Sequence, residues 1–434
     1  MKGQASRTGA GGDAGGWGMG GEQYPKKPMK KVATLVMGQS PPGTTYNEVG
    51  EDIPFYQGVR DFGGRHPSRR VYCTAPTRFA DAGDVLFSVR APIGEVNRAT
   101  EHCSIGRGLA AIRADNPLDT TYLEYVLRHI RTEWDILEGQ GAVFGNAKKS
   151  DLENLPVPWP YEGGRRAIAS ILGSLDDKIE LNRQMNATLE QIGQVIFKHW
   201  FVDFEFPNED GKPYRSSGGE MVDSELGEVP EGWGVTSIGD VVKVVGGGTP
   251  STKNPAFWNG GTHCWTTPKD LSNISSPVLL DTARKITDAG LAKVSSRLLP
   301  IGTFLLSSRA PVGYTAIAQV PLAVNQGYIA IPPSERLSSL FLLHWTCVNL
   351  ETIKGRACGT TFQEISKKNF RPIKIAVPTP EILTRFDRTV GRLFERIVAN
   401  EQESRALILI RDTLLPKLMS GEIRANSGEI KPAQ

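Results

Sequence analysis

The sequence repeats itself, and this repeat limits the fold to two copies of one module. Residues 83–94, GDVLFSVRAPIG, return as residues 302–313, GTFLLSSRAPVG. Residues 105–108, IGRG, return at the same distance along the chain as residues 324–327, VNQG. Such self-similarity indicates duplicated structural units. The residues between these anchors differ, so the two copies are expected to share a scaffold and to differ in the surface that they present.

Each copy begins with short apolar and β-branched runs that are broken by glycine and proline, the pattern of strands and turns. Examples are residues 241–245, VVKVV, and residues 314–318, YTAIA. A helical stretch follows in each copy, at residues 118–134 and 338–350. Each copy is therefore predicted to be a mixed α/β globule of about 140 residues.

A long segment with helical periodicity follows each globule. Apolar residues recur at the a and d positions of heptads, which is typical of helices that pair as coiled coils. The predicted seam residues are Ile168, Ile171, Leu175, Leu189, Ile192 and Ile196 in the first helix and Phe386, Leu393, Leu407, Ile410 and Leu414 in the second. At ~1.5 Å per residue, a first helix over residues 166–200 is roughly 50 Å long.

An asparagine lies at an a position midway along each stripe, Asn182 in the first helix and Asn400 in the second. If the helices pack antiparallel about a pseudo-two-fold axis, their midpoints meet. The two amides are then predicted to bond to each other across the seam and to fix its register. The alternative is that each asparagine faces solvent.

These features predict an α+β fold of two mixed α/β globules separated by two long antiparallel coiled-coil helices, with an internal pseudo-two-fold repeat. The predicted segments are a glycine-rich disordered leader (1–24), a first globule (25–164), a first helix (165–202), a linker (203–232), a second globule (233–380), a second helix (381–424) and a flexible tail (425–434). The leader lacks the apolar stretch of a signal peptide.

The composition argues against several classes of protein. With 50 Lys and Arg against 47 Asp and Glu the net charge is +3, so any nucleic-acid surface has to be local. No apolar run approaches the ~20 residues that a membrane span requires, and no membrane association is expected. The five cysteines contain no C-x-x-C pair, which argues against a disulfide scaffold or a zinc module and favours a reducing cytoplasm.

No catalytic motif is complete. Ser40-Pro-Pro-Gly43 resembles the loop with which base-amine methyltransferases hold a flipped base, but a glycine cannot stack on that base. Residues 246–253 have the glycines and the lysine of a P-loop in the wrong order. Asp203 and Asp210-Gly-Lys212 only loosely imitate a nuclease metal site, and the six histidines lack metal-ligand spacing. We therefore expect no catalytic, metal or cofactor site in this chain.

Basic residues concentrate in the first globule, where residues 26–113 contain 13 Lys and Arg against 8 Asp and Glu. Phosphate contacts supply affinity for DNA, whereas Arg on guanine and Asn or Gln on adenine supply sequence preference. The candidate DNA-binding residues are Gln57, Arg60, Arg65, Arg69 and Arg70 in the first globule and Lys253, Lys269 and Asn273 in the second. Each of them is equally well explained as a solvated surface residue.

Arg90 and Arg309 are further candidates because they recur in both copies, within the shared S-x-R-A-P-x-G segment. A residue that is identical in both copies cannot explain two different sequence preferences. We therefore expect these arginines to brace the turn or to contact phosphate. Residues that differ between the copies must carry the different readings.

Residues 169–186, ASILGSLDDKIELNRQMN, together with residues 197–204, FKHWFVDF, resemble the central conserved region of specificity subunits of type I restriction-modification enzymes. Residues 414–423, LLPKLMSGEI, resemble the distal conserved region. With the duplicated globules, the resemblance covers about Lys30 to Arg424. It implies that the globules are target-recognition domains and that the helices form an antiparallel spacer between them.

The resemblance implies a non-catalytic subunit that reads a bipartite, asymmetric site on double-stranded DNA. It further implies that the chain docks type I methyltransferase subunits and, through them, restriction or translocase subunits. S-adenosylmethionine, ATP and magnesium are then expected on these partners. Two alternatives stay open: a self-contained DNA methyltransferase or nuclease, and a scaffold of two globules on a helical spacer that does not bind DNA.

Overall fold

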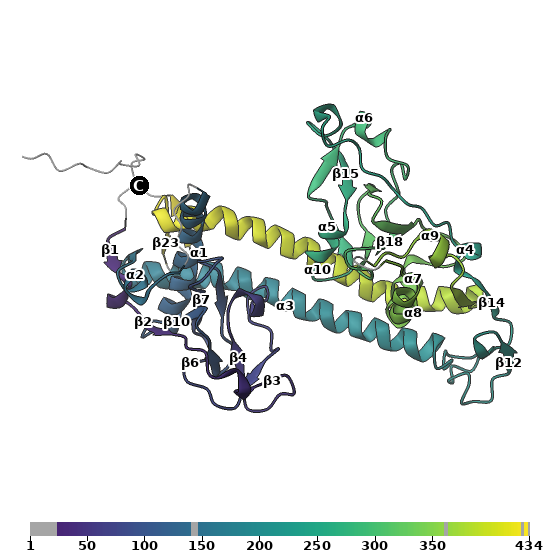
Figure 1. The fold of residues 1–434 in the computed structure, drawn as a ribbon, viewed down its shortest axis with the longest axis horizontal. Helices are drawn as coiled ribbons and strands as arrows, with labels where there is room; N and C mark the ends of the chain where they lie inside the picture. Colours follow the sequence, from purple (N-terminus) through teal and green to yellow (C-terminus); the bar gives the residue numbers. More distant parts are fainter. Residues whose placement is uncertain (1–23, 140–145, 360–362, 427–428, 433–434) are drawn as a thin grey trace, which may run out of the picture. The chain divides into compact units, whose positions relative to one another are not determined.

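The computed structural model describes residues 24–139, 146–359, 363–426 and 429–432. The predicted glycine-rich leader lies outside the described residues, except for Tyr24. The chain divides into two compact units (Figure 1): unit 1 is formed by residues 1–177 and 407–434, and unit 2 by residues 178–406. Each unit contains one of the two predicted globules.

In its described residues, unit 1 contains short strands, two helices before the first long helix, and three 3-10 turns. The strands are β1 Lys26–Pro28, β2 Thr34–Met37, β3 Tyr46–Asn47, β4 Ile53–Tyr56, β5 Tyr72–Cys73, β6 Phe79–Ala80, β7 Val85–Ser88, β8 Val96–Arg98, β9 Cys103–Ile105, β10 Leu109–Arg113 and β11 Pro156–Pro158. The helices are α1 Pro117–Gly139 and α2 Lys149–Glu153, and the turns are η1 Met29–Lys31, η2 Gly43–Thr45 and η3 Val59–Asp61. The sheets have the orders β2-β10-β7-β8, β3-β5-β4-β9-β6 and β1-β11.

Strand β7 explains why the shared segment of the repeat is so apolar. All four of its residues are buried. Val85 and Phe87 point into the core that contains α1, whereas Leu86 points into a second core with Ile105. Alternate residues of a strand face opposite sides, so a strand that is covered on both sides requires a continuous apolar run.

Unit 2 repeats this plan with longer insertions. Its strands are β12 Met221–Ser224, β13 Gly227–Pro230, β14 Gly234–Ser237, β15 His263–Thr266, β16 Val278–Leu279, β17 Arg284–Ile286, β18 Phe304–Ser307, β19 Thr315–Ala318, β20 Leu322–Val324, β21 Tyr328–Ile331 and β22 Lys374–Val377. Its short helices are α4 Ile238–Val241, α5 Pro268–Ser272, α6 Asp288–Leu291, α7 Ser339–Val348, α8 Leu350–Gly355 and α9 Lys367–Phe370, and its 3-10 turn is η4 Pro255–Phe257. The sheets have the orders β16-β19-β18-β21, β17-β15-β20, β14-β22 and β12-β13.

The duplication predicted from the sequence is confirmed by matching strand partners. In unit 1, β7 lies antiparallel to β8 and β10, and in unit 2, β18 lies antiparallel to β19 and β21. The parallel pair β4 with β9 corresponds to the parallel pair β15 with β20. The pair β1-β11 corresponds in the same way to β14-β22. The two globules therefore share one scaffold.

Two long helices, α3 Glu162–Phe201 and α10 Pro380–Ser420, each contribute to both units. Within unit 2 they run antiparallel, because the Phe197 ring lies 5.8 Å from the Phe386 ring while Asn182, earlier in α3, bonds to Asn400, later in α10. Within unit 1 the direction is the same: Leu172 shares an apolar core with Leu418, whereas Asp176, later in α3, accepts from Arg411, earlier in α10. The predicted antiparallel helix pair is thus present in each unit.

The predicted heptad seam is wrong over part of its length. From Asn182 as far as Phe197, the next buried residues of α3 are Asn186, Gly193 and Phe197, each one position after a heptad site. Phe201, at the end of the helix, is buried one turn later. A straight α-helix drifts by ~20° per heptad relative to a 3.5-residue repeat, so the buried stripe leaves the heptad positions. Ile192 is consequently 42% exposed, and Ile410 on α10 is 46% exposed.

The remaining predicted seam residues face the helix pair or the adjoining core to different degrees. Ile168 and Phe386 are fully buried. The half-buried ones are Ile171, Leu175, Leu189, Ile196, Leu393, Leu407 and Leu414. The apolar stripe was therefore assigned to the correct side of each helix, but its boundaries follow the 3.6-residue period.

The predicted bond between the two asparagine amides is also wrong, although both side chains are buried in the seam of unit 2. The Asn182 amide donates to the backbone carbonyl of Asn400 at 3.3 Å and to Glu403 Oε2 at 2.9 Å. The Asn400 amide donates instead to Oδ1 of Asn186 at 2.8 Å. Asn186 lies one helical turn beyond Asn182, so the drift of the stripe brings a third asparagine into the seam.

The segments predicted as a linker and as a flexible tail each pack against one of the units. In the predicted tail, β23 Ile423–Asn426 pairs antiparallel with β24 Glu429–Pro432, and Ala425 is buried in the core of unit 1. In the predicted linker, the Phe206 ring stacks on the Trp233 ring at 5.4 Å. The linker therefore packs against unit 2, because its aromatic side chains complete the apolar core there.

Candidate nucleic-acid interface

Four loops of unit 1 meet around the turn between β9 and β10. We call them loop edge 1: residues 38–43 after β2, residues 57–61 after β4, the turn 88–94, and the turn 106–108. A cavity of about 200 Å³ opens there, lined by Ser40, Gln57, Gly58, Val59, Arg90, Ala91, Arg107 and Gly108. The loops bring polar and cationic side chains from distant parts of the sequence into one place.

Backbone hydrogen bonds fix the turn 106–108 from three sides. The Gly106 N–H donates to the Tyr56 carbonyl at 2.8 Å, and the Gly108 carbonyl accepts from the Val89 N–H at 2.9 Å. The Gln39 N–H donates to the Ile105 carbonyl at 3.0 Å. These three contacts use main-chain atoms, so they do not depend on the side chain at the tip of the turn.

Unit 2 holds the equivalent turn in the same way. We call loop edge 2 residues 247–252, 267–270, 307–313 and 325–327. The Asn325 N–H donates to the Thr266 carbonyl at 3.0 Å, the Ser308 N–H donates to the Gly327 carbonyl at 2.8 Å, and the Gly248 N–H donates to the Val324 carbonyl at 3.1 Å. The two loop edges are thus built on the same set of backbone contacts.

Glycines allow this close packing. A Cβ atom on Gly38 would lie 2.2 Å from the Gly106 carbonyl oxygen, and one on Gly247 would lie 1.6 Å from the Val324 carbonyl oxygen. On Gly108 a Cβ atom would lie 2.3 Å from the Gln57 carbonyl oxygen. Only glycine permits the backbone to approach this closely without a shift of the neighbouring loop.

A carboxylate holds the loop after the parallel strand in each unit. In loop edge 1, Asp61 Oδ2 accepts the Gln57 N–H at 2.6 Å, and Asp61 Oδ1 accepts from Arg70 at 2.7 Å. In loop edge 2, Asp270 Oδ2 accepts the Thr267 N–H at 2.7 Å. These contacts position Gln57 and its neighbours without using their side chains.

A serine fixes the turn, shared by both copies of the repeat, that carries Arg90 or Arg309. Ser88 donates its hydroxyl to the Pro92 carbonyl at 2.7 Å, and Ser307 donates to the Pro311 carbonyl at 2.8 Å. Arg90 is exposed beside Arg107, whereas Arg309 forms an ion pair with Glu364, with Nη1 at 3.6 Å from Oε2. The serine braces the turn, which leaves the arginine side chains on its outside.

Comparison with known proteins then decides the family. A family profile described as "Type I restriction modification DNA specificity domain" matches residues 24–191 and, a second time, residues 230–401. The chain belongs to this family. The two matches coincide with the two copies of the repeat.

Relatives of this specificity chain carry consistent names. The type I restriction enzyme MjaIX specificity subunit of Methanocaldococcus jannaschii is 28% identical over 418 residues, which cover 91% of this chain and 93% of the relative. The proposed MjaX specificity subunit of the same organism is 39% identical over 168 residues, 38% of this chain and 39% of the relative. The S subunit structure of a type I system from M. genitalium matches over 93% of this chain with a TM-score of 0.56 and 16% identity, which supports the fold.

The chain is accordingly a DNA-specificity subunit and not itself a catalyst, as the resemblance implied. Across the residues that the structure describes, no group of three or more His, Cys, Asp or Glu side chains is arranged to hold a metal ion. Over the same residues, none of the helices is both long enough and apolar enough to cross a membrane.

The structure brings only some of the predicted DNA-binding residues of this specificity subunit to the loop edges. Gln57 and Arg90 line the cavity of loop edge 1, and Arg60 is exposed on turn η3 of the same loop edge. Lys269 and Arg309 both lie in loop edge 2, Arg309 on the turn 307–313. Lys253 and Asn273 are exposed just outside the loops that define loop edge 2.

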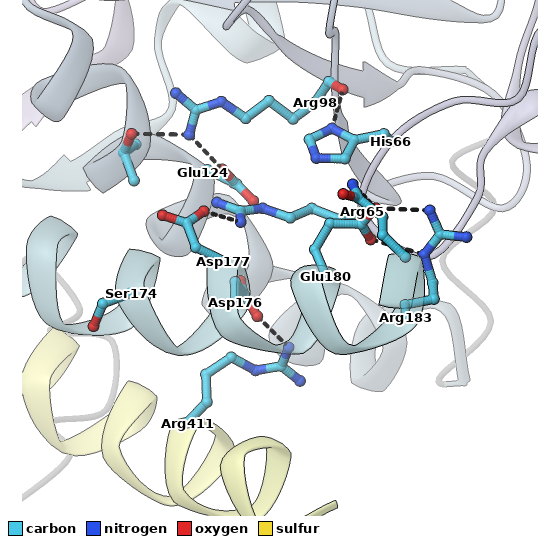
Figure 2. A network of polar contacts seen from close by, with 12 residues as sticks. Arg65, His66, Arg98, Glu124, Ser174, Asp176, Asp177, Glu180, Arg183 and Arg411 are labelled. Atoms are coloured by element: carbon cyan, nitrogen blue, oxygen red, sulfur yellow. Dashed lines mark hydrogen bonds and ion pairs between the residues drawn. The ribbon is translucent and has the colours of Figure 1, made fainter. Parts of the chain in front are cut away.

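Arg65 has a different role, which Figure 2 shows. Its side chain is only 11% exposed and forms an ion pair with Asp177 of α3. Nearby, Arg98 donates to Glu124 at 3.1 Å, and its backbone carbonyl contacts His66 Nδ1 at 2.9 Å. Arg65 therefore joins the globule of unit 1 to α3, and the prediction that it contacts DNA is not supported by its burial.

The same network continues to α10 through Asp176 (Figure 2). This carboxylate accepts from Arg411 at 2.6 Å, from Arg128 at 2.8 Å and from the Tyr125 hydroxyl at 2.8 Å. Burial raises the pKa of Asp176, but Arg128 and Arg411 outweigh burial, so the pKa lies below its ordinary value. The network stabilises unit 1 and offers no free cation to DNA.

Arg69 and Arg70 also form ion pairs with carboxylates of unit 1. Arg69 makes a bidentate pair with Glu101 at 2.6 and 2.7 Å, and Arg70 binds Asp61. Sequence reasoning instead missed Arg107, which it counted only as part of the basic excess. The signal was present, because residues 105–108 and 324–327 are a repeat that keeps only its last glycine, and the residue before this glycine is Arg in one copy and Gln in the other.

Proposed function

We propose that this specificity subunit reads a split, asymmetric site on double-stranded DNA, with unit 1 reading one half and unit 2 the other. One observation carries this proposal: both units present the same four loops on the same backbone contacts, while the side chains of these loops differ. A shared scaffold explains why both bind the same kind of ligand. Different side chains explain why the two half-sites differ.

We further propose that methyltransferase subunits dock on the long helices. Apolar side chains on these helices point to solvent, with Val195 67% exposed on α3 in unit 2 and Leu409 69% exposed on α10 in unit 1. Each has a further exposed apolar residue near it in the same helix, Ile192 near Val195 and Ile408 next to Leu409. Groups of exposed apolar side chains are typical of binding surfaces. The methyltransferase subunits bring S-adenosylmethionine, and restriction subunits that join through them bring ATP and magnesium. We also propose that the complex acts in the cytoplasm.

The test is co-expression with the cognate methyltransferase subunit in a host that lacks adenine methylation. The chain alone should leave the host DNA unmethylated, and the pair should methylate adenines within one bipartite motif. Methyl transfer by the purified chain alone would revive the alternative of a self-contained methyltransferase. A pair that forms no complex and binds no duplex in a competitor-resistant way would favour the scaffold alternative.

A further inference from the structure

The turns at the centres of the two loop edges differ in the residue at their tips. Arg107 stands between Gly106 and Gly108, and Gln326 stands at the matching position between Asn325 and Gly327. Both side chains are exposed. Three matching backbone hydrogen bonds hold each turn, so the exchange of Arg for Gln changes the chemistry of the tip and keeps these three contacts.

Arginine and glutamine are the side chains that discriminate bases best through paired hydrogen bonds. Arginine donates two hydrogen bonds to N7 and O6 of guanine, and glutamine accepts from N6 and donates to N7 of adenine in the major groove. Within the described residues, no hydrogen bond or ion pair occupies the Arg107 guanidinium. Its five donors are free for a ligand.

Gln326 is oriented by a neighbour at the corresponding place. The Thr249 hydroxyl donates to Gln326 Oε1 at 2.7 Å. Ser40, the counterpart of Thr249 in loop edge 1, accepts the Arg107 N–H at 3.2 Å. One lone pair of Gln326 Oε1 and both amide hydrogens remain available, which is the pattern that adenine requires.

The neighbouring arginines give the contrast that separates base reading from phosphate binding. Arg90 lines the same cavity as Arg107, and its counterpart Arg309 is also arginine. A cation kept in both copies suits phosphate, which every sequence has. A side chain that changes from guanine reader to adenine reader between copies suits the bases.

We propose that Arg107 reads a guanine in the half-site of unit 1 and that Gln326 reads an adenine in the half-site of unit 2. This inference rests on the proposed function, and it assigns the residues through which that function distinguishes sequences. Each residue determines one base pair of its own half-site and no base pair of the other.

The experiment uses the full chain with its cognate methyltransferase subunit in a methylation-free host, and sequencing of the host genome reports the methylated motif. Arg107→Gln should replace guanine by adenine at one position of one half-site. Gln326→Arg should make the reverse change in the other half-site. Arg107→Ala should relax that single position, with discrimination lowered roughly 5- to 150-fold, the factor that corresponds to the ~1–3 kcal/mol of a bidentate base contact.

Two comparison variants accompany these. Lys149→Gln removes an exposed cation on α2, outside loop edge 1, and should change neither the motif nor the extent of methylation. Arg90→Gln should lower methylation at all sites alike and leave the motif unchanged. The thermal unfolding temperature of each variant checks that it folds.

An unchanged motif in both Arg107→Ala and Gln326→Ala would overturn the inference. A bipartite motif in the wild-type control would still support the proposed function in that case. If a variant complex gives no methylation, its binding is measured on duplexes in which each base pair of the wild-type motif is exchanged in turn. Weakening confined to one position supports base reading, and equal weakening on every duplex overturns it. A wild-type complex with no motif at all would instead overturn the proposed function.

Discussion

At the scale of single residues, the basic side chains of unit 1 separate into two kinds. Arg65, Arg69 and Arg70 are paired with carboxylates and support the fold. Arg90 and Arg107 project from loop edge 1 with no carboxylate partner among the described residues. A count of charges along the sequence treats both kinds alike, because it does not show which carboxylates the fold brings near.

Arg65→Gln should lower the free energy of unfolding of unit 1 by about 1 kcal/mol and leave the methylated motif unchanged. The figure is small because Asp177, which loses its partner, is 73% exposed and becomes hydrated. Chemical denaturation measures the loss. Arg60→Gln, which removes an exposed cation, is the matched control and should leave stability unchanged. An altered motif with unaltered stability would show that Arg65 reads DNA after all.

Glu190 should make unit 2 more stable in mild acid than in mild base. Burial, and secondarily the nearby Glu401 carboxylate, raise the pKa of Glu190 to about 7. A folded-state pKa above the unfolded value means that the folded chain holds the proton more tightly. The contribution to stability is therefore complete below about pH 4.5 and is lost as the pH rises through about 7.

Glu190→Gln should accordingly raise the thermal unfolding temperature at pH 8 and leave it nearly unchanged at pH 5. At pH 8 the free energy of unfolding should rise by about 1–2 kcal/mol. A shift of one pKa unit corresponds to about 1.36 kcal/mol, and partial solvation of the Glu190 carboxyl reduces this effect. Glu351→Gln, an exposed position on α8, serves as the control. Equal stabilisation at both pH values would contradict a titration of Glu190.

The sequence predicted the positions of residues well where a backbone turn of the repeat determines them. It predicted them poorly where packing against a distant part of the chain determines them. The repeat itself located Arg90 and Arg309 on equivalent turns, and that placement was correct. Burial of Arg65 could not be predicted, because Asp177 lies more than a hundred residues away in the sequence. Arg107 could have been identified from the sequence, because the two copies of the repeat differ at this position. The number of charges in the first globule does not single it out.

At the scale of elements, the long helices show what a periodic pattern can and cannot predict. Their existence, direction and apolar side were predictable because the pattern extends over many turns. The exact contact positions were not, because a difference of a tenth of a residue per turn accumulates. Ile192 and Ile410 look equivalent to seam residues in the sequence and are exposed in the structure.

The asparagine contacts of the seam give a test at this scale. Asn400→Ala should destabilise unit 2 by about 1–3 kcal/mol, because it leaves the buried Oδ1 of Asn186 without a donor. The double variant Asn186→Ala with Asn400→Ala should lose less free energy of unfolding than the two single variants lose in sum. A double-mutant cycle in urea measures this coupling. Strict additivity would mean that the two amides do not depend on each other.

The exposed apolar residues of the helices lead to a second test. Leu409→Glu should weaken binding of the methyltransferase subunit roughly tenfold or more, because burying an unpaired carboxylate costs more than 1.4 kcal/mol. Co-purification and titration of the two subunits report the effect. Val49→Glu, at an exposed position of unit 1 away from the helices, should bind normally. Unimpaired binding of Leu409→Glu would exclude this part of α10 from the docking surface.

At the scale of the whole molecule, the family profile recognises two separate stretches, and the structure divides into two units. The number of modules could be predicted from the repeat. The strand orders could not, because partners such as β4 and β9 are distant in sequence and short strands carry little information on pairing.

Exchange of residues 233–380 for the matching segment of a related specificity subunit should change one half-site of the motif and keep the other. The reason is that the contacts of loop edge 1 all lie within unit 1. Sequencing of methylated host DNA gives the result. A change in both half-sites would show that the two units do not read independently.

The glycines that press the loops against each turn have a genetic consequence. Because Gly38 and Gly247 let the neighbouring main chain hold the turn, the tip can change from arginine to glutamine with no compensating mutation elsewhere. The codons CGA and CGG for arginine become the glutamine codons CAA and CAG by replacement of one nucleotide. A lineage that carries such a gene can therefore acquire a new DNA preference in a single mutational step, with the fold and its partners unaltered.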